Sequence, residues 1–322
     1  MKKAYISLIT NNDFMYGLIA MLKTYSMVKN DIPMYVMVTD RISDINREII
    51  KHFGADVIEV SAITLPNSYE GKYMDPHRER NIHTGMAKLN VFNLTQFDKV
   101  VFVDADVLFI RNCDELFDKP SFSMVPDPGL YKRDDVKCPD GGNGGMMVIE
   151  PSEAIFNDLM KIFNSYKDKD FDTINDQDIT YEYLKNWPER EDLHVDIRYN
   201  FQANFAGTVE FPFSVFDLLQ VKILHMMGLE KPWRVPDHRY FTYHGGNLFD
   251  GLNTLYVDII NFCIKDLSIN KLYTPDLHYI EWNEIPYTRK ILGSDYPKRG
   301  SLYESLPNNI FELKFPWSQK ED

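Results

Sequence analysis

Two aspartates at the end of an apolar run are the residues best placed to do chemistry. Residues 100–103 are Val, Val, Phe and Val, and Asp104-Ala105-Asp106 follows directly. In an extended chain, side chains two positions apart face the same side, so Asp104 and Asp106 present their carboxylates together. Hard oxygen ligands of this kind suit Mn²⁺ or Mg²⁺, and such an ion can bridge to phosphates. A solvated turn after a strand is the plainer alternative.

A phosphohydrolase of the haloacid-dehalogenase type also carries an Asp-x-Asp at a strand end, where the first Asp is the nucleophile. That pattern usually lies on the first strand and continues with Thr or Val two residues after the second Asp. Here Leu108 stands at that position, and about a hundred residues precede the acidic pair. The placement argues against this alternative.

The elements that must position the acidic pair alternate along the first half of the chain. Apolar runs predict strands at 4–9, 34–38, 57–60 and 100–103, and helical spacing predicts helices at 17–28, 43–53 and 86–94, with Ser43 as an N-cap. A β-α-β-α-β opening is typical of a parallel sheet covered by helices. Open sheets of this class bind ligands at the carboxyl ends of their strands, which is where Asp104 lies.

The second half of the chain is less regular. We expect a glycine-dense loop at 140–145, strands at 146–149 and 221–224, and helices at 152–166, 176–184 and 252–264. The second of these strands ends at His225. No internal repeat or linker interrupts the chain, so residues 1–245 are predicted to be one catalytic domain, with residues 246–322 as a C-terminal extension packed on it.

Composition excludes several classes of function. The formal net charge of −13 argues against a nucleic-acid-binding protein, although one local cationic pocket suffices for a small anion. Cys113, Cys138 and Cys263 are too few and too widely spaced for a disulfide framework, which favours a reducing compartment. No run of about 18 apolar residues is present, so no membrane association is predicted. We expect a soluble cytoplasmic protein.

Several motifs in the same order resemble the glycogenin-like glycosyltransferases of family 8, over roughly residues 3–245. The motifs are Leu8-Ile9-Thr10-Asn11, Ala87-Lys88-Leu89, Leu94 to Lys99, Phe102 to Asp106, Pro126-Asp127-Pro128-Gly129, Asn143-Gly144-Gly145, Asp176-Gln177 and the run from His225 to Trp233. Each motif alone is a weak signal, but all of them together in the family's order are a strong one.

The resemblance implies an α/β fold: a single Rossmann-like nucleotide-sugar transferase domain of the GT-A type, with a mixed, mostly parallel central sheet. It also implies a retaining transfer of a hexose, with glucose or galactose favoured. The donor would be a UDP-sugar, and the acceptor a hydroxyl of a sugar, polyol or glycan. Mn²⁺ is the implied metal, with Mg²⁺ as an alternative, and a homodimer is compatible with this family.

The resemblance also assigns roles to residues. Asp104, Asp106 and His225 would bind the metal, although a single histidine after a strand is more often packed or on the surface. The donor-binding set is Leu8, Thr10, Asn11, Lys88, Asp104, Ala105, Asp106, Asn143, Gly144, Gly228 and Lys231. Gly228 would let the backbone approach the diphosphate, and Lys231 would place a point charge on the β-phosphate. Either Lys88 or Lys231 alone would read as a solvated surface charge.

Around the transferred hexose, the resemblance places Asp127, Asn143, Asp176 and Gln177. The predicted catalytic residues are Asp176, Gln177 and Lys231, since Asp176 or Gln177 is the candidate nucleophile if the reaction is a double displacement. Attack from the same face of the sugar is the other route, and the resemblance leaves both open.

Two departures separate this chain from glycogenin itself. Glycogenin glucosylates a tyrosine of its own in the segment before the metal histidine, whereas residues 207–216 here contain no tyrosine. The stretch between Gly129 and Asn143 is also longer. Galactinol synthases, which are relatives, modify separate small acceptors. A degenerate protein that binds nucleotide sugar without turnover is the remaining alternative, and the complete metal triad with Lys231 argues against it.

Overall fold

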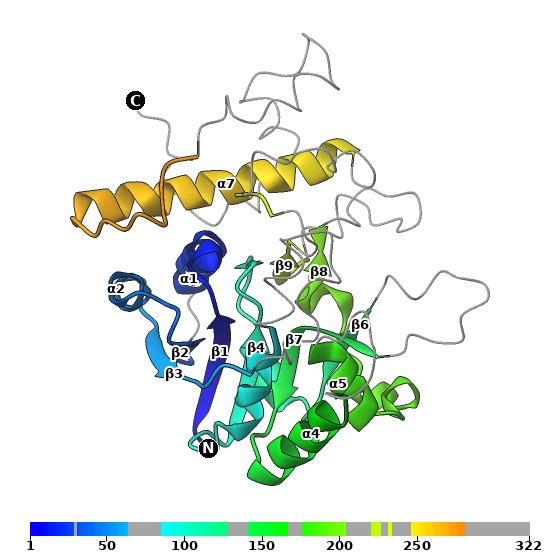
Figure 1. The fold of residues 1–322 in the computed structure, drawn as a ribbon. Helices are drawn as coiled ribbons and strands as arrows, with labels where there is room; N and C mark the ends of the chain where they lie inside the picture. Colours follow the sequence, from blue (N-terminus) through cyan, green and yellow to red (C-terminus); the bar gives the residue numbers. More distant parts are fainter. Residues whose placement is uncertain are drawn as a thin grey trace. The chain divides into compact units, whose positions relative to one another are not determined.

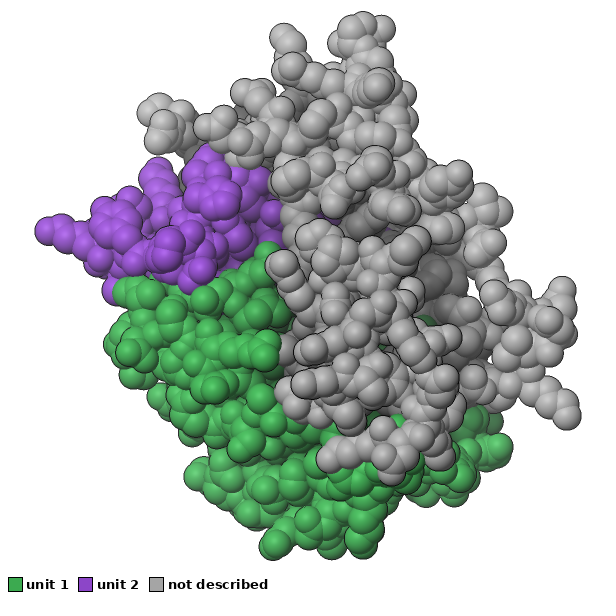
Figure 2. All heavy atoms as spheres, viewed as in Figure 1, with its two compact units in different colours: residues 1–14, 30–105, 113–200 green, residues 15–29, 106–112, 201–322 purple. Residues whose placement is uncertain are grey.

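The computed structural model describes residues 1–28, 31–63, 85–127, 141–166, 176–203, 220–226, 231–233 and 246–280. The chain divides into two compact units, shown in separate colours in Figure 2. Unit 1 comprises residues 1–14, 30–105 and 113–200, and unit 2 comprises residues 15–29, 106–112 and 201–322. Each unit has a sheet of its own.

Unit 1 is built on a six-stranded sheet of order β3-β2-β1-β4-β7-β6 (Figure 1). Its strands are β1 (Lys3–Ile9), β2 (Met34–Val38), β3 (Asp56–Glu59), β4 (Lys99–Val103), β6 (Met124–Pro126) and β7 (Gly142–Ile149). The pairs among β1 to β4 are parallel, while β7 is antiparallel to both β4 and β6. This mixed, mostly parallel α/β sheet confirms the predicted fold class.

Helices cover this sheet over a continuous apolar core. They are α2 (Asp44–His52), the 3₁₀ helix η3 (Met86–Asn93), α4 (Glu153–Tyr166) and α5 (Asp176–Tyr183). One face of the sheet contributes Ala4, Ile6, Val100, Phe102 and Ile149, which pack into a single cluster with residues of η3, α4 and α5. Because the central strands are buried on both faces, they read as nearly unbroken apolar runs, and this is why they were easy to predict.

The helix expected at 86–94 is a 3₁₀ helix rather than an α-helix. Met86, Leu89 and Phe92 are buried at intervals of three residues, which eclipse one another in a 3₁₀ helix, and Ala87 and Val91 are buried as well. The helix carries Lys88 on a different face from this buried row.

The glycine-dense stretch predicted as a loop is mostly strand, because β7 begins at Gly142 and all of its residues are buried. A Cβ on Gly142 would lie 2.5 Å from the Cβ of Met124 and 2.9 Å from the ring of Trp187. The prediction of a loop at 140–145 was therefore wrong from Gly142 onward. Glycine is present there because the neighbouring side chains leave no room for another residue.

Unit 2 combines a three-stranded sheet of order β5-β9-β8 with two helices. The strands are β5 (Val107–Phe109), β8 (Phe201–Gln202) and β9 (Ile223–His225), and the helices are α1 (Met15–Met27) and α7 (Gly246–Ile269). Phe109 N donates to Thr24 Oγ1 at 3.1 Å, and the Tyr256 hydroxyl donates to Gly17 O at 3.3 Å. Strand β5 and helix α7 are thus each bonded to α1.

The chain that follows α7 is held against unit 2. Asn261 Nδ2 donates to Ile280 O at 2.8 Å, and Ile280 N donates back to Asn261 Oδ1 at 2.8 Å. The expected helix at 252–264 is confirmed and is longer at both ends. The division into residues 1–245 and 246–322 stays a prediction. Within the described parts of the chain, no helix is both long and apolar enough to cross a membrane.

Short 3₁₀ helices complete the described structure. They are η1 (Asn12–Phe14), η4 (Asp114–Asp118), η6 (Trp187–Glu189), η7 (Glu191–Leu193) and η8 (Ile197–Tyr199). Of these, η1 begins three residues after the end of β1, and Asn200 is the C-cap of η8. Thr10 and Asn11 thus lie between β1 and η1.

Candidate functional site

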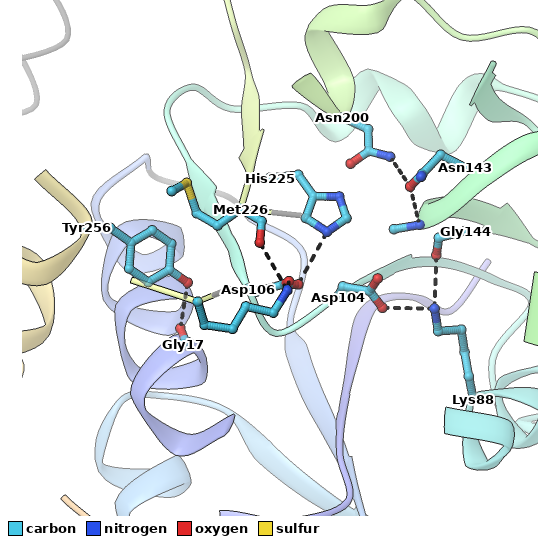
Figure 3. Close-up of polar contacts among 12 residues, drawn as sticks. Gly17, Lys88, Asp104, Asp106, Asn143, Gly144, Asn200, His225, Met226 and Tyr256 are labelled. Atoms are coloured by element: carbon cyan, nitrogen blue, oxygen red, sulfur yellow. Dashed lines mark hydrogen bonds and ion pairs between the residues drawn. The ribbon is translucent and has the colours of Figure 1, made fainter. Parts of the chain in front are cut away.

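The three predicted metal ligands come together in the structure. Asp104, Asp106 and His225 each offer one ligand atom, and these atoms all lie within 4.8 Å of one another (Figure 3). Asp104 directly follows β4, where its N–H donates to Gly145 O at 3.0 Å. Two carboxylates and an imidazole are a donor set that suits a divalent ion such as Mn²⁺. The residues present therefore fit the metal that the sequence predicted.

Strand pairing explains how His225 reaches Asp106 from more than a hundred residues away. β9 runs antiparallel to β5, with His225 opposite Val107, the residue that follows Asp106. Met226 N then donates to Asp106 O at 3.0 Å, which extends the pairing by one residue. His225 Nε2 lies 3.4 Å from Asp106 Oδ1, and both side chains are almost fully buried. Backbone geometry, rather than a flexible loop, thus holds the pair.

Lys231 is also buried beside Asp106. Its ammonium donates to Asp106 Oδ2 and, at 3.0 Å, to Met226 O. Burial alone would raise the pKa of Asp106, but Lys231 and His225 outweigh it and hold that pKa well below its usual range. Asp106 is therefore ionised at neutral pH, and the Lys231 charge balances it.

Lys88 pairs with Asp104, the other predicted carboxylate ligand, as Lys231 pairs with Asp106. The Lys88 ammonium lies 3.0 Å from Asp104 Oδ1 and 3.4 Å from Gly144 O (Figure 3). It also lies 2.9 Å from Asp176 Oδ2. Burial alone would lower the pKa of Lys88, but the charges of Asp104 and Asp176 outweigh it and raise the pKa above its ordinary value. Lys88 is therefore a permanent cation shared by two acids.

The start of β7 connects the residues predicted to surround the hexose. Gly144 N donates to Gln177 Oε1 at 2.9 Å, and Asn143 Nδ2 lies 3.4 Å from Asp127 Oδ2. Asp176, next to Gln177, is the second partner of Lys88. These contacts bring the predicted residues together, and their roles around a hexose stay predictions.

The predicted nucleotide-binding residues lie at and beyond the carboxyl end of β1. Leu8 is half-buried on the strand, Thr10 is buried, and Thr10 O accepts from Thr39 Oγ1 at 3.4 Å. Asn11 Oδ1 is buried and has no hydrogen-bond partner among the described residues. A buried acceptor without a partner is costly unless a ligand satisfies it, so Asn11 fits the N–H of a bound base.

Two buried asparagines beside these groups were missed. Asn46 of α2 donates to Asn12 Oδ1 at 2.9 Å, and Asn200 donates to Asn143 Oδ1 at 2.8 Å. Both residues are fully buried, but in the sequence each is one polar residue among many, with no spacing that marks it. Among the predicted residues, Gly228 lies outside the described part of the chain, as do residues 128–140 and 207–216, where the two departures from glycogenin fall.

Comparison with known proteins places the chain in a family. The model for glycosyl transferase family 8 matches residues 5–236, which is well over half of the chain, and the chain belongs to this family. The family assignment made from the ordered motifs is thereby confirmed.

Several characterised relatives are similar over about three quarters of this chain. Human glycogenin-2 is 28% identical over 250 residues, covering 77% of this chain and 46% of its own length. Inositol phosphorylceramide glucuronosyltransferase 1 of Arabidopsis thaliana is 28% identical over 247 residues, covering 72% of this chain and 42% of its own length. Human glycogenin-1 is 27% identical over 232 residues, covering 72% of this chain and 62% of its own. The chain thus spans less than two thirds of the length of these relatives.

Solved structures share the fold. A crystal structure of the galactosyltransferase LgtC with donor and acceptor sugar analogues has a TM-score of 0.53 at 20% identity, covering 78% of this chain and 95% of LgtC. An active-site mutant of LgtC gives a TM-score of 0.54 at 19% identity, with 80% and 94% covered. These neighbours are GT-A glycosyltransferases, so the fold is the predicted one.

Proposed function

We propose that this protein is a retaining, metal-dependent glycosyltransferase that moves a hexose from a UDP-sugar to a hydroxyl acceptor. The observation that carries the proposal is that Asp104, Asp106 and His225 lie within reach of one ion in a chain of family 8. Lys231 contacts the carboxylate of Asp106 in the same cluster. A degenerate binding protein would have no need to keep a complete ligand set together with its balancing lysine.

The metal is proposed to be Mn²⁺, with Mg²⁺ as the second choice, held by Asp104, Asp106 and His225. When bound, it supplies positive charge to the departing nucleoside diphosphate. Lys231 is proposed to add its own charge at the β-phosphate, because it is a cation within the same cluster. Gly228 would allow the backbone to approach the diphosphate closely, and Ala105 lies between the two ligand aspartates.

At the other end of the donor, Leu8, Thr10 and Asn11 are proposed to bind the base and ribose. The buried Oδ1 of Asn11 supports this role, since it has no hydrogen-bond partner among the described residues and can accept from a base N–H. The donor sugar would then lie near the start of β7, beside Asn143 and Gly144. This order of base, diphosphate and sugar follows the strand ends along the sheet edge.

Contacts of the residues proposed to surround the hexose favour attack from the same face of the sugar over a double displacement. A double displacement needs a free nucleophile, but Gln177 Oε1 accepts from Gly144 N at 2.9 Å and Asp176 pairs with Lys88 at 2.9 Å. One oxygen of each candidate nucleophile is thus held by a hydrogen-bond or ion-pair partner. In same-face attack, the acceptor proton would pass to the leaving phosphate, and Asp176 and Gln177 would position the sugar.

A neutral hexose, such as glucose or galactose, fits the charges better than a uronate. Two relatives are named as glucuronosyltransferases, so a uronate donor is the natural competitor. A uronate carboxylate requires a cation, yet Lys88 is already shared by Asp104 and Asp176. Asp127, which lies 3.4 Å from Asn143 Nδ2, is a further acidic residue on this side of the site.

The acceptor is proposed to be a hydroxyl of a separate sugar, polyol or glycan rather than a tyrosine of this chain. Residues 207–216 contain no tyrosine at the position where glycogenin modifies itself. A cytoplasmic location and a homodimer stay predictions.

Release of UDP from a panel of UDP-sugars, measured with and without Mn²⁺, tests the proposal. We expect Mn²⁺-dependent release from UDP-glucose or UDP-galactose, and loss of that release in an Asp104→Asn, Asp106→Asn double variant. His225→Ala should retain activity only at raised Mn²⁺. Unchanged metal-dependent transfer in the double variant would refute the ligand assignment. Binding without release would identify a degenerate binder, and hydrolysis of a generic phosphate ester would identify a phosphohydrolase.

A further inference from the structure

We propose that Asn200 is a positioning residue that fixes which way the carboxamide of Asn143 faces, and so determines which hydroxyl pattern the hexose site accepts. The inference rests on the proposed function. It concerns a side chain to which neither the sequence motifs nor the family resemblance gave a role.

Asn200 is held rigidly at the end of η8. Its side chain is fully buried, and its N–H donates to Ile197 O at 3.1 Å. From this fixed backbone, Nδ2 donates to Asn143 Oδ1 at 2.8 Å (Figure 3). A buried amide with a short, well-directed bond to a residue at the sugar site is an orienting contact rather than a surface one.

Asn143 is constrained from both sides. Its Oδ1 accepts from Asn200 Nδ2 and also from Gly145 N at 2.9 Å, so two donors face the oxygen. Its Nδ2 is directed to Asp127 Oδ2, 3.4 Å away, and an ionised carboxylate can only accept. If the amide turned over, its NH₂ would meet two donors and its oxygen would meet a carboxylate. One orientation of Asn143 is therefore strongly preferred, and Asn200 supplies part of that preference.

This orientation presents an amide donor beside a carboxylate acceptor. A sugar hydroxyl can accept from Asn143 and donate to Asp127 at the same time, because a hydroxyl is both donor and acceptor. A donor sugar without that hydroxyl loses both bonds. The pair thus selects sugars that have a free hydroxyl at one ring position.

The side chain of Asn143 is also connected, through Gly145, to the backbone of Asp104. Gly145 N bonds to Asn143, and Gly145 O accepts from Asp104 N at 3.0 Å. A displaced Asn143 would therefore affect the neighbouring backbone as well as the hydroxyl contact. For this reason the test must separate binding of the sugar from binding of the nucleotide.

The test compares UDP with UDP-hexose in the presence of Mn²⁺. In Asn200→Ala, we expect UDP to bind within about twofold of the wild type, while the extra affinity contributed by the hexose falls by about tenfold to a hundredfold. Asn200→Asp keeps the size of the side chain but removes the donor, so it should lose at least as much. This near-isosteric variant decides the question if the alanine variant does not fold.

Monodeoxy UDP-hexoses give a second readout that a merely structural role would not produce. With the wild-type protein, removal of one hydroxyl should weaken binding, and Asn200→Ala should weaken that same deoxy donor no further. The other deoxy donors should still lose affinity in the variant. Coupling between one hydroxyl and Asn200 is the expected signature.

Asn261→Ala is the matched control. Asn261 is also a buried amide, and both of its bonds to Ile280 are 2.8 Å long. It should lower thermal stability but leave the hexose increment unchanged. The inference is overturned if the Asn200 variants bind UDP-hexose as the wild type does, or lose UDP and UDP-hexose equally. Failure of the wild type to bind or turn over any UDP-sugar would instead overturn the proposed function.

Discussion

Replacement of Lys88 by methionine tests how much the ion pairs of Lys88 with Asp104 and Asp176 contribute to the free energy of unfolding. Methionine retains the length and apolar body of the side chain, so the change removes mainly the charge. Without the ammonium, Asp104 and Asp176 lose the cation that contacts each of them at about 3 Å. The two carboxylates then repel each other in a partly buried setting.

The expected loss follows from distance and exposure. Each contact near 3 Å has a Coulomb energy of about 5 kcal/mol at an effective dielectric constant of 20, before the cost of burying the charges. Removal of one partner from a buried pair costs about 3–5 kcal/mol. The side chains of Asp104 and Asp176 are 28% and 18% exposed, so water screens part of this energy. We therefore expect the free energy of unfolding to fall by about 2–3 kcal/mol.

Urea denaturation without divalent ions measures this loss, and Lys161→Met is the matched control. Lys161 also pairs with an aspartate at 2.8 Å, but its side chain is 77% exposed, so that variant should change stability by less than about 0.5 kcal/mol. Saturating Mn²⁺ should recover part of the Lys88→Met loss, because charge supplied at Asp104 replaces some of what was removed. Equal stability of the Lys88 and Lys161 variants would refute the reasoning.

Three further predictions concern packing and burial. Gly142→Ala should lower the free energy of unfolding by about 2 kcal/mol in urea, since its Cβ would lie 2.5 Å from a neighbouring methionine; Gly144→Ala, with 3.3 Å to its nearest atom, should cost clearly less. Burial raises the pKa of Cys263, so its thiolate fraction at pH 8 is small and alkylation should proceed only as fast as unfolding; rapid labelling of the native protein would contradict this. Asn261→Ala should speed amide exchange at Ile280 by about tenfold to a hundredfold, because Ile280 N donates to Asn261 Oδ1. An unchanged rate would show that this hydrogen bond does not protect the Ile280 amide.

Some parts of the fold could be predicted because a single local pattern determines them. β1, β2 and β4 are buried on both faces, so their apolar runs stand out in the sequence, and the helices between them give the parallel order. The acidic pair at the end of β4 could likewise be recognised from its place after an apolar run. The family motifs then linked it to His225.

Other parts depend on contacts between residues that are far apart in the chain. The sequence around Gly142 gives no sign that Trp187 packs against it, so the glycines of residues 141–145 indicated a loop where a strand exists. The contact of Asn200 with Asn143 joins residues 57 positions apart, and no periodicity signals it. Strand β5 is only three residues long and was not predicted, because its pairing with β9 defines it. Local patterns thus gave the framework, whereas tertiary packing determined these details.

The contact of Lys231 with Asp106 has a consequence for how the protein folds. In a structural metal site, ionised ligands left without their ion repel each other, and the fold often depends on the metal. Here the ammonium already neutralises the most buried acid of the ligand set. The polypeptide therefore carries its own counter-ion at Asp106, and we expect it to fold without a divalent ion. On the proposed function, metal binding would then be a reversible exchange of one cation for another, and a chelator should abolish transfer without lowering the free energy of unfolding.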